Sequence, residues 1–338
     1  MKLDLTVMHG CQNRFATVDE DMSPIADSLK SALVLAIAAR LDVHGVLFLS
    51  ARGGLRMRIF DRDGTEATMC GNGIRCAARY FRDHSCATGS HFTIGTLDGP
   101  KPVSLENRWV TVDMGRARDY RRLAEERHFA FTGIPHLVIL VGGISVDAAR
   151  AEGRRLRYDR ALGAALEHPD GLHVNFVQVS ADGSLDVLTY EAGVEDVTPA
   201  CGTGSTAAAY VCARSGRTSF PVRVRLLGGE LVIDARRDSM TMRGPAEYMT
   251  PFMLEWPAET TVSQPSDRRA GSWDMIKIVT AGQASASSME SLAGDGARYT
   301  WKPLGVPSCH PRPKPRAPRR CSSACNFQAS PTRSNDRR

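Results

Sequence analysis

Two short segments of the chain each place a cysteine directly before a glycine turn and a run of helix-forming residues. Residues 69–80 read MCGNGIRCAARY, and residues 200–210 read ACGTGSTAAAY. Glycines permit a sharp turn, so the free backbone N–H groups that follow belong to a helix N-terminus, which carries partial positive charge. A thiol at such a position has its thiolate form stabilised. The repeat therefore predicts that Cys70 and Cys201 face each other across one bound molecule.

Two thiols on opposite faces of a carbon acid suit the inversion of an amino-acid α-carbon. Either Cys70 or Cys201 abstracts the α-proton as a thiolate while the other donates a proton as a thiol, and the roles exchange in the reverse direction. Backbone N–H groups at the two helix starts would bind the α-carboxylate and stabilise the charge that grows on it. We assign this binding to Gly71, Asn72, Gly202 and Thr203.

No cofactor motif accompanies the thiols in residues 1–250. This part contains no cofactor lysine motif, phosphate-binding glycine loop or metal-ligand cluster with recognisable spacing. We therefore expect a reaction that needs no cofactor and no metal.

A single cysteine before a helix is usually a small buried apolar residue, but finding the same turn twice in matching places argues against that interpretation. The other cysteines of this part do not repeat in this way, and they are Cys11, Cys76, Cys86 and Cys212. Cys76 and Cys212 lie inside helices and are expected in the core. A redox function, with a reversible disulfide between Cys70 and Cys201, stays open as an alternative.

The elements around the two turns follow one order in both halves of the chain. In each half, the sequence pattern predicts a strand, a turn, a helix after the cysteine and a three-stranded meander. The two cysteines are 131 positions apart, which is the spacing of a whole domain. We expect an α+β fold of two pseudo-symmetric lobes, each a mostly antiparallel sheet wrapped around a central helix. The lobes would span residues 1–120 and 121–250, and this arrangement allows the N-terminal and the C-terminal strand each to cross to the other lobe.

Charge and composition set residues 251–338 apart from the rest. The 338-residue chain has a net charge of +6. Residues 251–338 contain thirteen basic and seven acidic residues, so they carry all of this net charge. This region is rich in proline, serine and arginine, and we expect it to be disordered. Its possible zinc ligands match no common zinc-finger spacing, and they are Cys309, His310, Cys321 and Cys325.

The balanced charge of residues 1–250 argues against a nucleic-acid partner. The longest apolar stretch, residues 32–49, is interrupted by Arg40, Asp42 and His44, which argues against a membrane span. The N-terminus lacks the apolar run of a signal peptide, and nine cysteines are an odd number that suits reduced thiols. We expect a cytoplasmic protein with a small-molecule amino-acid substrate. A homodimer stays open.

From about residue 7 to residue 246 the chain resembles the diaminopimelate epimerase family of pyridoxal-independent amino-acid racemases. The segment HGCQNRF at residues 9–15 is similar to the family's His-Gly-x-x-Asn-Asp-Phe, and GIPH at residues 133–136 to its Gly-Asn-Pro-His. Residues 60–80 and 190–209 resemble its two cysteine segments, and residues 174–177 its Val-Asn strand.

The resemblance implies a role for several residues. Cys70 and Cys201 become the acid/base pair, and His136 and Glu191 become neighbours that help to set their protonation. The residues left for substrate binding are Asn13, Asp61 and Asn175, together with the helix-start residues.

The chain departs from the family at the end of the site that would hold the distal part of the substrate. Asp61 and Ile134 stand where the family has Asn, and Ala192 stands where it has an Arg that pairs with the distal carboxylate of diaminopimelate. Losing that Arg removes a bidentate clamp, and Asp61 would repel a carboxylate. A substrate with a neutral or cationic distal group fits better, with histidine first because histidine racemases belong to the same broader group. The alternatives are diaminopimelate itself and a proline or hydroxyproline epimerase reaction.

Overall fold

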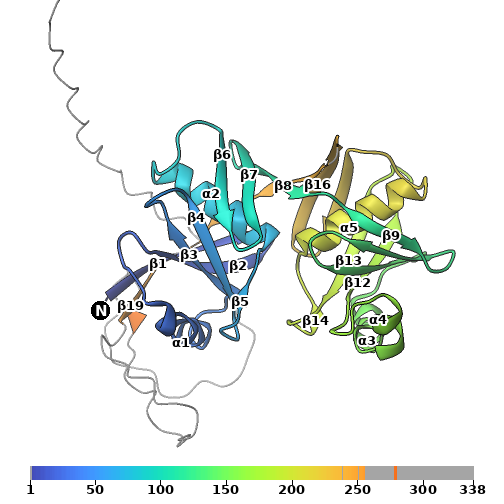
Figure 1. Cartoon of the computed structure of the whole chain (residues 1–338), viewed down its shortest axis with the longest axis horizontal. Coiled ribbons are helices and arrows are strands. Elements are labelled where there is room, and N and C mark those ends of the chain that lie inside the picture. Colours follow the sequence, from blue (N-terminus) through green and yellow to red (C-terminus); the bar gives the residue numbers. More distant parts are fainter. Residues whose placement is uncertain (1, 238, 250, 256–277, 280–338) are drawn as a thin grey trace, which may run out of the picture. The chain divides into compact units, whose positions relative to one another are not determined.

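The computed structural model describes residues 2–237, 239–249, 251–255 and 278–279. The first half of the chain supplies ten elements, shown in blue to green in Figure 1: β1 (Lys2–Gly10), β2 (Asn13–Asp19), α1 (Asp27–Ala38), β3 (Gly45–Ser50), β4 (Arg56–Asp61), β5 (Glu66–Ala67), α2 (Gly71–Asp83), β6 (His91–Thr96), β7 (Gly99–Glu106) and β8 (Trp109–Gly115).

The second half supplies β9 (Arg118–Arg122), β10 (Arg127–Phe131), β11 (Pro135–Leu140), α3 (Val146–Arg157), α4 (Arg160–Ala165), β12 (His173–Val179), β13 (Leu185–Glu191), β14 (Asp196–Val197), α5 (Gly202–Arg214), β15 (Val222–Leu226), β16 (Gly229–Arg236) and β17 (Ser239–Pro245). Three short strands follow: β18 (Glu247–Tyr248), β19 (Phe252–Glu255) and β20 (Ile278–Val279).

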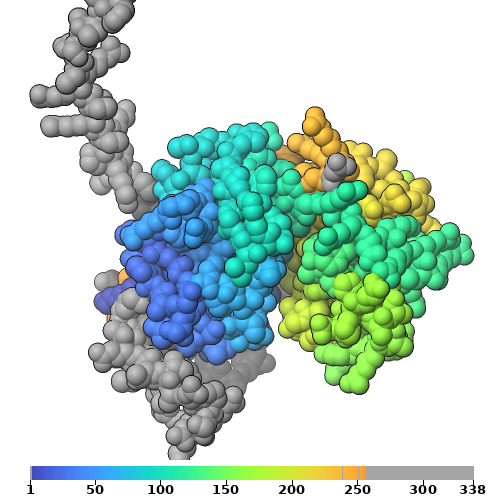
Figure 2. Space-filling model, in the orientation of Figure 1, coloured from blue at the N-terminus to red at the C-terminus, as the bar shows by residue number. Residues whose placement is uncertain are grey.

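The strands of the two halves pair in the same order. In the first half β1 and β2 are antiparallel, β2 and β3 parallel, β3 and β4 antiparallel, β4 and β6 parallel, and β6 to β8 an antiparallel meander. In the second half β10, β11, β12, β13 and the meander from β15 to β17 repeat this sequence of pairings. The predicted α+β fold of two similar lobes is confirmed. In the space-filling view the two halves form separate surface regions (Figure 2).

Each lobe is built around the helix that follows its cysteine. Helix α2 packs on β1, β3, β4, β7 and β8, and α5 packs on β10 to β13 and on β15 to β17. Figure 1 shows each helix beside the strands of its own half. Residues 76–78 of α2 and 207–209 of α5 are small and completely buried. They let the strands of each lobe pack closely against its helix. Cys76 and Cys212 are both buried core residues, as expected.

Strand β8 joins the lobes by pairing with β17, from Met240 opposite Gly115 to Pro245 opposite Trp109. After β17 the chain returns to the first lobe, where β18 and β19 pair with β1. The predicted crossing of the C-terminal strand is therefore present, whereas in the described residues β1 pairs only with strands that lie in the first lobe.

The structured part continues beyond the predicted start of the tail at residue 251. In β19 Leu254 is opposite Leu3 and Phe252 is opposite Leu5, so an alternating apolar segment covers the edge of β1. The composition of the region as a whole hid this short strand. Residues 256–277 and 280–338, with the cysteines predicted in the tail, lie outside the described residues. The division of the chain at residue 120 stays a prediction. Within the described residues, no helix has both the length and the apolar character needed to cross a membrane.

Candidate active site

Both cysteines of the repeated turns are helix N-cap residues. Cys70 precedes α2 and Cys201 precedes α5, each with extended backbone angles. The Sγ atom of Cys70 accepts a hydrogen bond from the N–H of Gly73 at 3.5 Å, and Sγ of Cys201 accepts one from the N–H of Gly204 at 3.4 Å. The thiols thus occupy the place of a capping oxygen and point toward the positive ends of the helices.

Glycine lets the two helix starts meet. A Cβ atom added to Gly71 would lie 2.8 Å from Cε of Met242 and 3.6 Å from Cα of Gly202. The Asn72 side chain ties the starts together, because its Nδ2 donates to the carbonyl of Ala200 at 2.8 Å. This close approach brings both thiols to one cavity.

The cavity between the helix starts has a volume of about 100 Å³. It is lined by Asn13, Thr68, Met69, Cys70, Gly71, Asn72, Asp98, Met114, Thr132, Gly133, Ile134, Glu191, Ala200, Cys201, Gly202 and Thr203. Most of the predicted site residues are therefore together. Asn13 and Asn72 each have a buried Oδ1 atom without a hydrogen-bond partner among the described residues, so both offer a polar contact to a ligand.

Three predicted site residues do not line this cavity, namely Asp61, His136 and Asn175, and neither does Ala192. The Asn175 amide is fully used by its neighbours, since Nδ2 donates to Leu137 O at 2.9 Å and Oδ1 accepts from Thr189 Oγ1 at 2.9 Å. It also donates to His136 Nδ1 at 3.1 Å. Asn175 and His136 thus form a buried, hydrogen-bonded layer near Cys201 and outside the lining of the cavity.

Burial dominates the protonation of both thiols. It raises the pKa of Cys70 to about 11, although the N–H groups of Gly73 and Asn72 lower it. It raises the pKa of Cys201 well above the ordinary value, and the nearby Glu191 raises it further. The helix N-termini do favour the thiolates, as expected, but desolvation outweighs this effect in the free site.

Glu191 is hydrogen-bonded to Cys201. Burial raises the pKa of its carboxyl group to about 7, although hydrogen bonds from Thr198 and Cys201 lower it. Asp61 is exposed to solvent yet closely surrounded by protein, and desolvation with repulsion from Asp63 raises its pKa to about 6. Both carboxyl groups therefore change charge near neutral pH.

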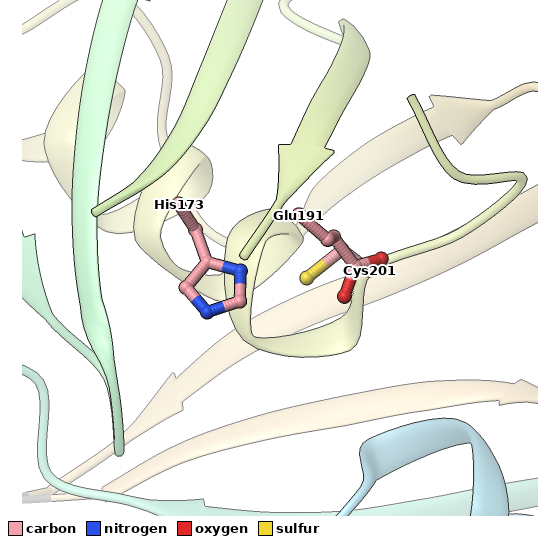
Figure 3. Close-up of side chains that lie close together, drawn as sticks. All are labelled: His173, Glu191 and Cys201. Carbon is pink, nitrogen blue, oxygen red and sulfur yellow. The ribbon is translucent and has the colours of Figure 1, made fainter. Parts of the chain in front are cut away.

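The sequence interpretation missed His173. One ring nitrogen of His173, a carboxylate oxygen of Glu191 and Sγ of Cys201 all lie within 4.8 Å of one another (Figure 3). His173 stands two residues before Asn175 on β12 and beside His136 in the parallel register of β11 and β12. Side chains two apart on a strand share a face, so the Val-Asn strand could have indicated it. Burial lowers the pKa of His173 to about 4, which keeps the ring neutral.

The comparisons with known proteins agree with this geometry. The family model described as diaminopimelate epimerase matches residues 5–119 and 129–249. A diaminopimelate epimerase from Archaeoglobus fulgidus is 35% identical over 272 residues, covering 73% of this chain and 94% of that protein. One from Methanocella arvoryzae is 34% identical over 270 residues, covering 73% and 94%.

A solved structure shares the fold at much lower identity. A phenazine biosynthesis protein of the PhzF family from Bacillus anthracis aligns with a TM-score of 0.60 at 12% identity, covering 75% of this chain and 99% of that chain. The family model matches both lobes, and each cysteine turn lies inside a matched segment. The chain belongs to the diaminopimelate epimerase family, and it is an isomerase of the cofactor-independent racemase and epimerase class.

Proposed function

We propose that the protein inverts the α-carbon of an amino acid with Cys70 and Cys201 as the two acid/base groups. The observation that carries this proposal is that two thiols, each capping a helix, line one small cavity. An α-carboxylate at the abutting helix starts would accept hydrogen bonds from free backbone N–H groups of both lobes. The α-carbon then lies between the thiols.

Glu191 accepts the proton that Cys201 must lose before it can act as a base. Cys201 passes its proton to the Glu191 carboxylate, takes the α-proton as a thiolate, and Cys70 donates its own proton to the opposite face. The negative charge of the intermediate is held by the helix N-termini. His136 and Asn175 support this arrangement from behind, so we propose that they position Cys201 and His173 instead of reacting.

The charges along the cavity favour a substrate without a distal carboxylate. Its lining includes the acidic residues Asp98 and Glu191 and contains no Lys or Arg among the described residues. Asp98 pairs with Lys101 at 2.6 Å, so that cation is already engaged. A second carboxylate of diaminopimelate would be left unpaired, which costs several kcal/mol when buried. We therefore propose histidine as the first candidate substrate and basic amino acids next.

Diaminopimelate itself is the second candidate. The observation in its favour is that relatives 31–35% identical carry the name diaminopimelate epimerase, which would place the reaction in lysine biosynthesis. A cytoplasmic location and the lack of a nucleic-acid partner stay predictions from the sequence.

Deuterium incorporation separates these candidates. The purified, reduced protein is incubated in deuterated water with histidine, lysine, arginine, LL- or meso-diaminopimelate, and α-deuterium is followed by mass spectrometry. We expect fast, saturable exchange with histidine and little with diaminopimelate. Rapid exchange with diaminopimelate alone would contradict the altered specificity, and no exchange with any amino acid would contradict the proposed reaction.

A double variant tests the position of the distal pocket. Ala192→Arg with Ile134→Asn restores two of the three distal residues of the family, including the carboxylate clamp, and one bidentate pair contributes about 1.5–3 kcal/mol. The preference for diaminopimelate over histidine should rise about 10–100-fold. No such gain in a folded double variant would mean that the distal end of the substrate lies elsewhere.

A further inference from the structure

Three side chains with metal-ligating atoms meet at the second thiol. The ligating atoms of His173, Glu191 and Cys201 lie within 4.8 Å of one another. Imidazole, carboxylate and thiolate are the three protein ligand types of zinc, and a site with three protein ligands keeps its fourth position open. Ligand atoms around a tetrahedral zinc ion lie about 3–4 Å apart at ordinary bond lengths, so small side-chain rotations would complete the site.

The imidazole lacks a partner that a metal ion would provide. Nδ1 of His173 is buried and makes no hydrogen bond to any described residue. In the view of Figure 3 a ring nitrogen of His173 faces the sulfur of Cys201, and the Glu191 carboxylate lies on the other side of that sulfur. The ring also packs against His136, with ring centroids 5.2 Å apart. A buried ring nitrogen directed at a thiol and without a partner calls for an explanation.

The charges around the cluster are also suited to a cation. Glu191 and Cys201 repel each other's negative charge, and the further charged neighbours that act on them are Asp61 and Cys70, both acidic. Arg157 acts on His173, but its charge is paired with Glu195 at 3.3 Å. Glu191 and Cys201 line the cavity and His173 lies outside its lining, so an ion that enters the cavity meets the carboxylate and the thiol first. A divalent cation would compensate a thiolate and a carboxylate fully.

We propose that His173, Glu191 and Cys201 form an inhibitory binding site for Zn²⁺ or a similar borderline-soft divalent cation. The inhibition rests on the proposed function, since it requires Cys201 to be an acid/base group. Binding replaces the S–H bond of Cys201 with a sulfur–zinc bond, and the proton passes to solvent. Cys201 can then no longer exchange a proton with the substrate, and removal of the ion restores the thiol.

Cobalt(II) tests the site without any reference to activity. The full chain, reduced and freed of metal with a chelator, is titrated with Co²⁺, and the thiolate-to-cobalt absorption band is measured. We expect a band that Zn²⁺ displaces, that Cys201→Ser removes and that Cys70→Ser retains. The Cys201→Ser spectrum also subtracts any binding by cysteines outside the described residues. His173→Asn and Glu191→Gln should each weaken cobalt binding about 10–100-fold, whereas His91→Gln, at an exposed histidine, should not.

The matching activity measurement is zinc inhibition of α-deuterium exchange. We expect the inhibition to be reversed by chelator, and His173→Asn to need at least about tenfold more zinc. A Cys201-dependent band without exchange by any amino acid would retain the zinc site and reject the proposed function. Exchange without such a band, or a band that Cys201→Ser leaves intact in the folded variant, would overturn the zinc site.

Discussion

The two lobes have the same scaffold but surround their thiols with different chemistry. In the first lobe Phe15 pairs with Gly45 across the parallel strands β2 and β3, and in the second lobe His136 pairs with His173 at the equivalent place. The last residue of β4 is Asp61, and the last residue of β13 is Glu191.

The first lobe has no room for the imidazole that the second lobe carries. A Cβ atom on Gly45 would lie 2.5 Å from the carbonyl oxygen of Phe60, so no larger side chain can replace it without backbone movement. The scaffold thus places both thiols alike, whereas among the described residues the two imidazoles lie on the side of Cys201. Glu191 is hydrogen-bonded to Cys201 and acts on Cys70 only through its charge, as Asp61 does. The backbone around the two thiols is therefore symmetric, whereas the ionisable side chains that surround them differ.

Removal of either thiol should have the largest effect. Cys70→Ser and Cys201→Ser keep the size of the side chain but lose an acid/base group of suitable pKa, so racemisation should fall by at least about 10²–10⁴-fold. Each variant should fold normally by circular dichroism. Each should also exchange deuterium with one enantiomer more than with the other, and with opposite preference. Racemisation at the parental rate in either variant would exclude the two-thiol mechanism.

Glu191→Gln compared with Asp61→Asn tests the asymmetry of the carboxyl groups. Because the Glu191 pKa is about 7, kcat/KM should rise with pH through about 7, and Glu191→Gln should remove this limb and lower the rate at pH 8 by about 10²-fold or more. Asp61→Asn should retain the limb and shift it to lower pH, since Asp61 raises the pKa of Glu191. Equal effects of the two variants would contradict the asymmetry.

Glu191 should also lower the free energy of unfolding above neutral pH. The folded state holds the Glu191 proton up to about pH 7, whereas an unfolded glutamate releases it near 4.5. The folded protein therefore binds more protons between these values, and its free energy of unfolding falls as the pH rises through that window. Glu191→Gln should be more stable than the parent at pH 8 by up to about 3 kcal/mol, and similar at pH 4.5, by denaturant titration.

Two matched glycines give the smallest expected effects. A Cβ atom on Gly204 would lie 2.4 Å from Asn175 Oδ1 and 2.9 Å from Thr189 Oγ1, whereas one on Gly73 would lie 3.0 Å from a methyl group of Leu47. Gly204→Ala should lower the free energy of unfolding by about 2–3 kcal/mol and Gly73→Ala by about 1 kcal/mol. A larger loss for Gly73→Ala would mean that the polar layer behind Cys201 is not rigid.

Local signals in the sequence were sufficient to place the two thiols. A helix N-cap needs only a few neighbouring residues, so the turns at Cys70 and Cys201 could be predicted, and their repetition indicated two lobes. The site of His173 depends on sheet register, because β12 must lie parallel to β11 and begin next to Cys201, the N-cap residue of α5. No pattern within β12 alone states which strands will be its neighbours.

Burial was the other quantity that the sequence did not provide. The helix starts at Cys70 and Cys201 correctly indicate N–H groups that favour the thiolates, but burial raises the pKa of each thiol by more than these groups lower it. In the same way Asn175 looked like a ligand-binding amide, and only its three neighbours show that its hydrogen bonds are already used.

The return of the chain to β1 has a consequence for the order of synthesis. Strand β1 is made before every other described strand, and among the described residues one of its edges pairs only with β18 and β19, with Leu3 opposite Leu254. Until almost the whole structured chain has emerged, the first lobe exposes an unpaired edge strand, which is a template for pairing with other chains. The nascent first lobe therefore keeps this edge open until β18 and β19, which are made after the whole second lobe, complete it.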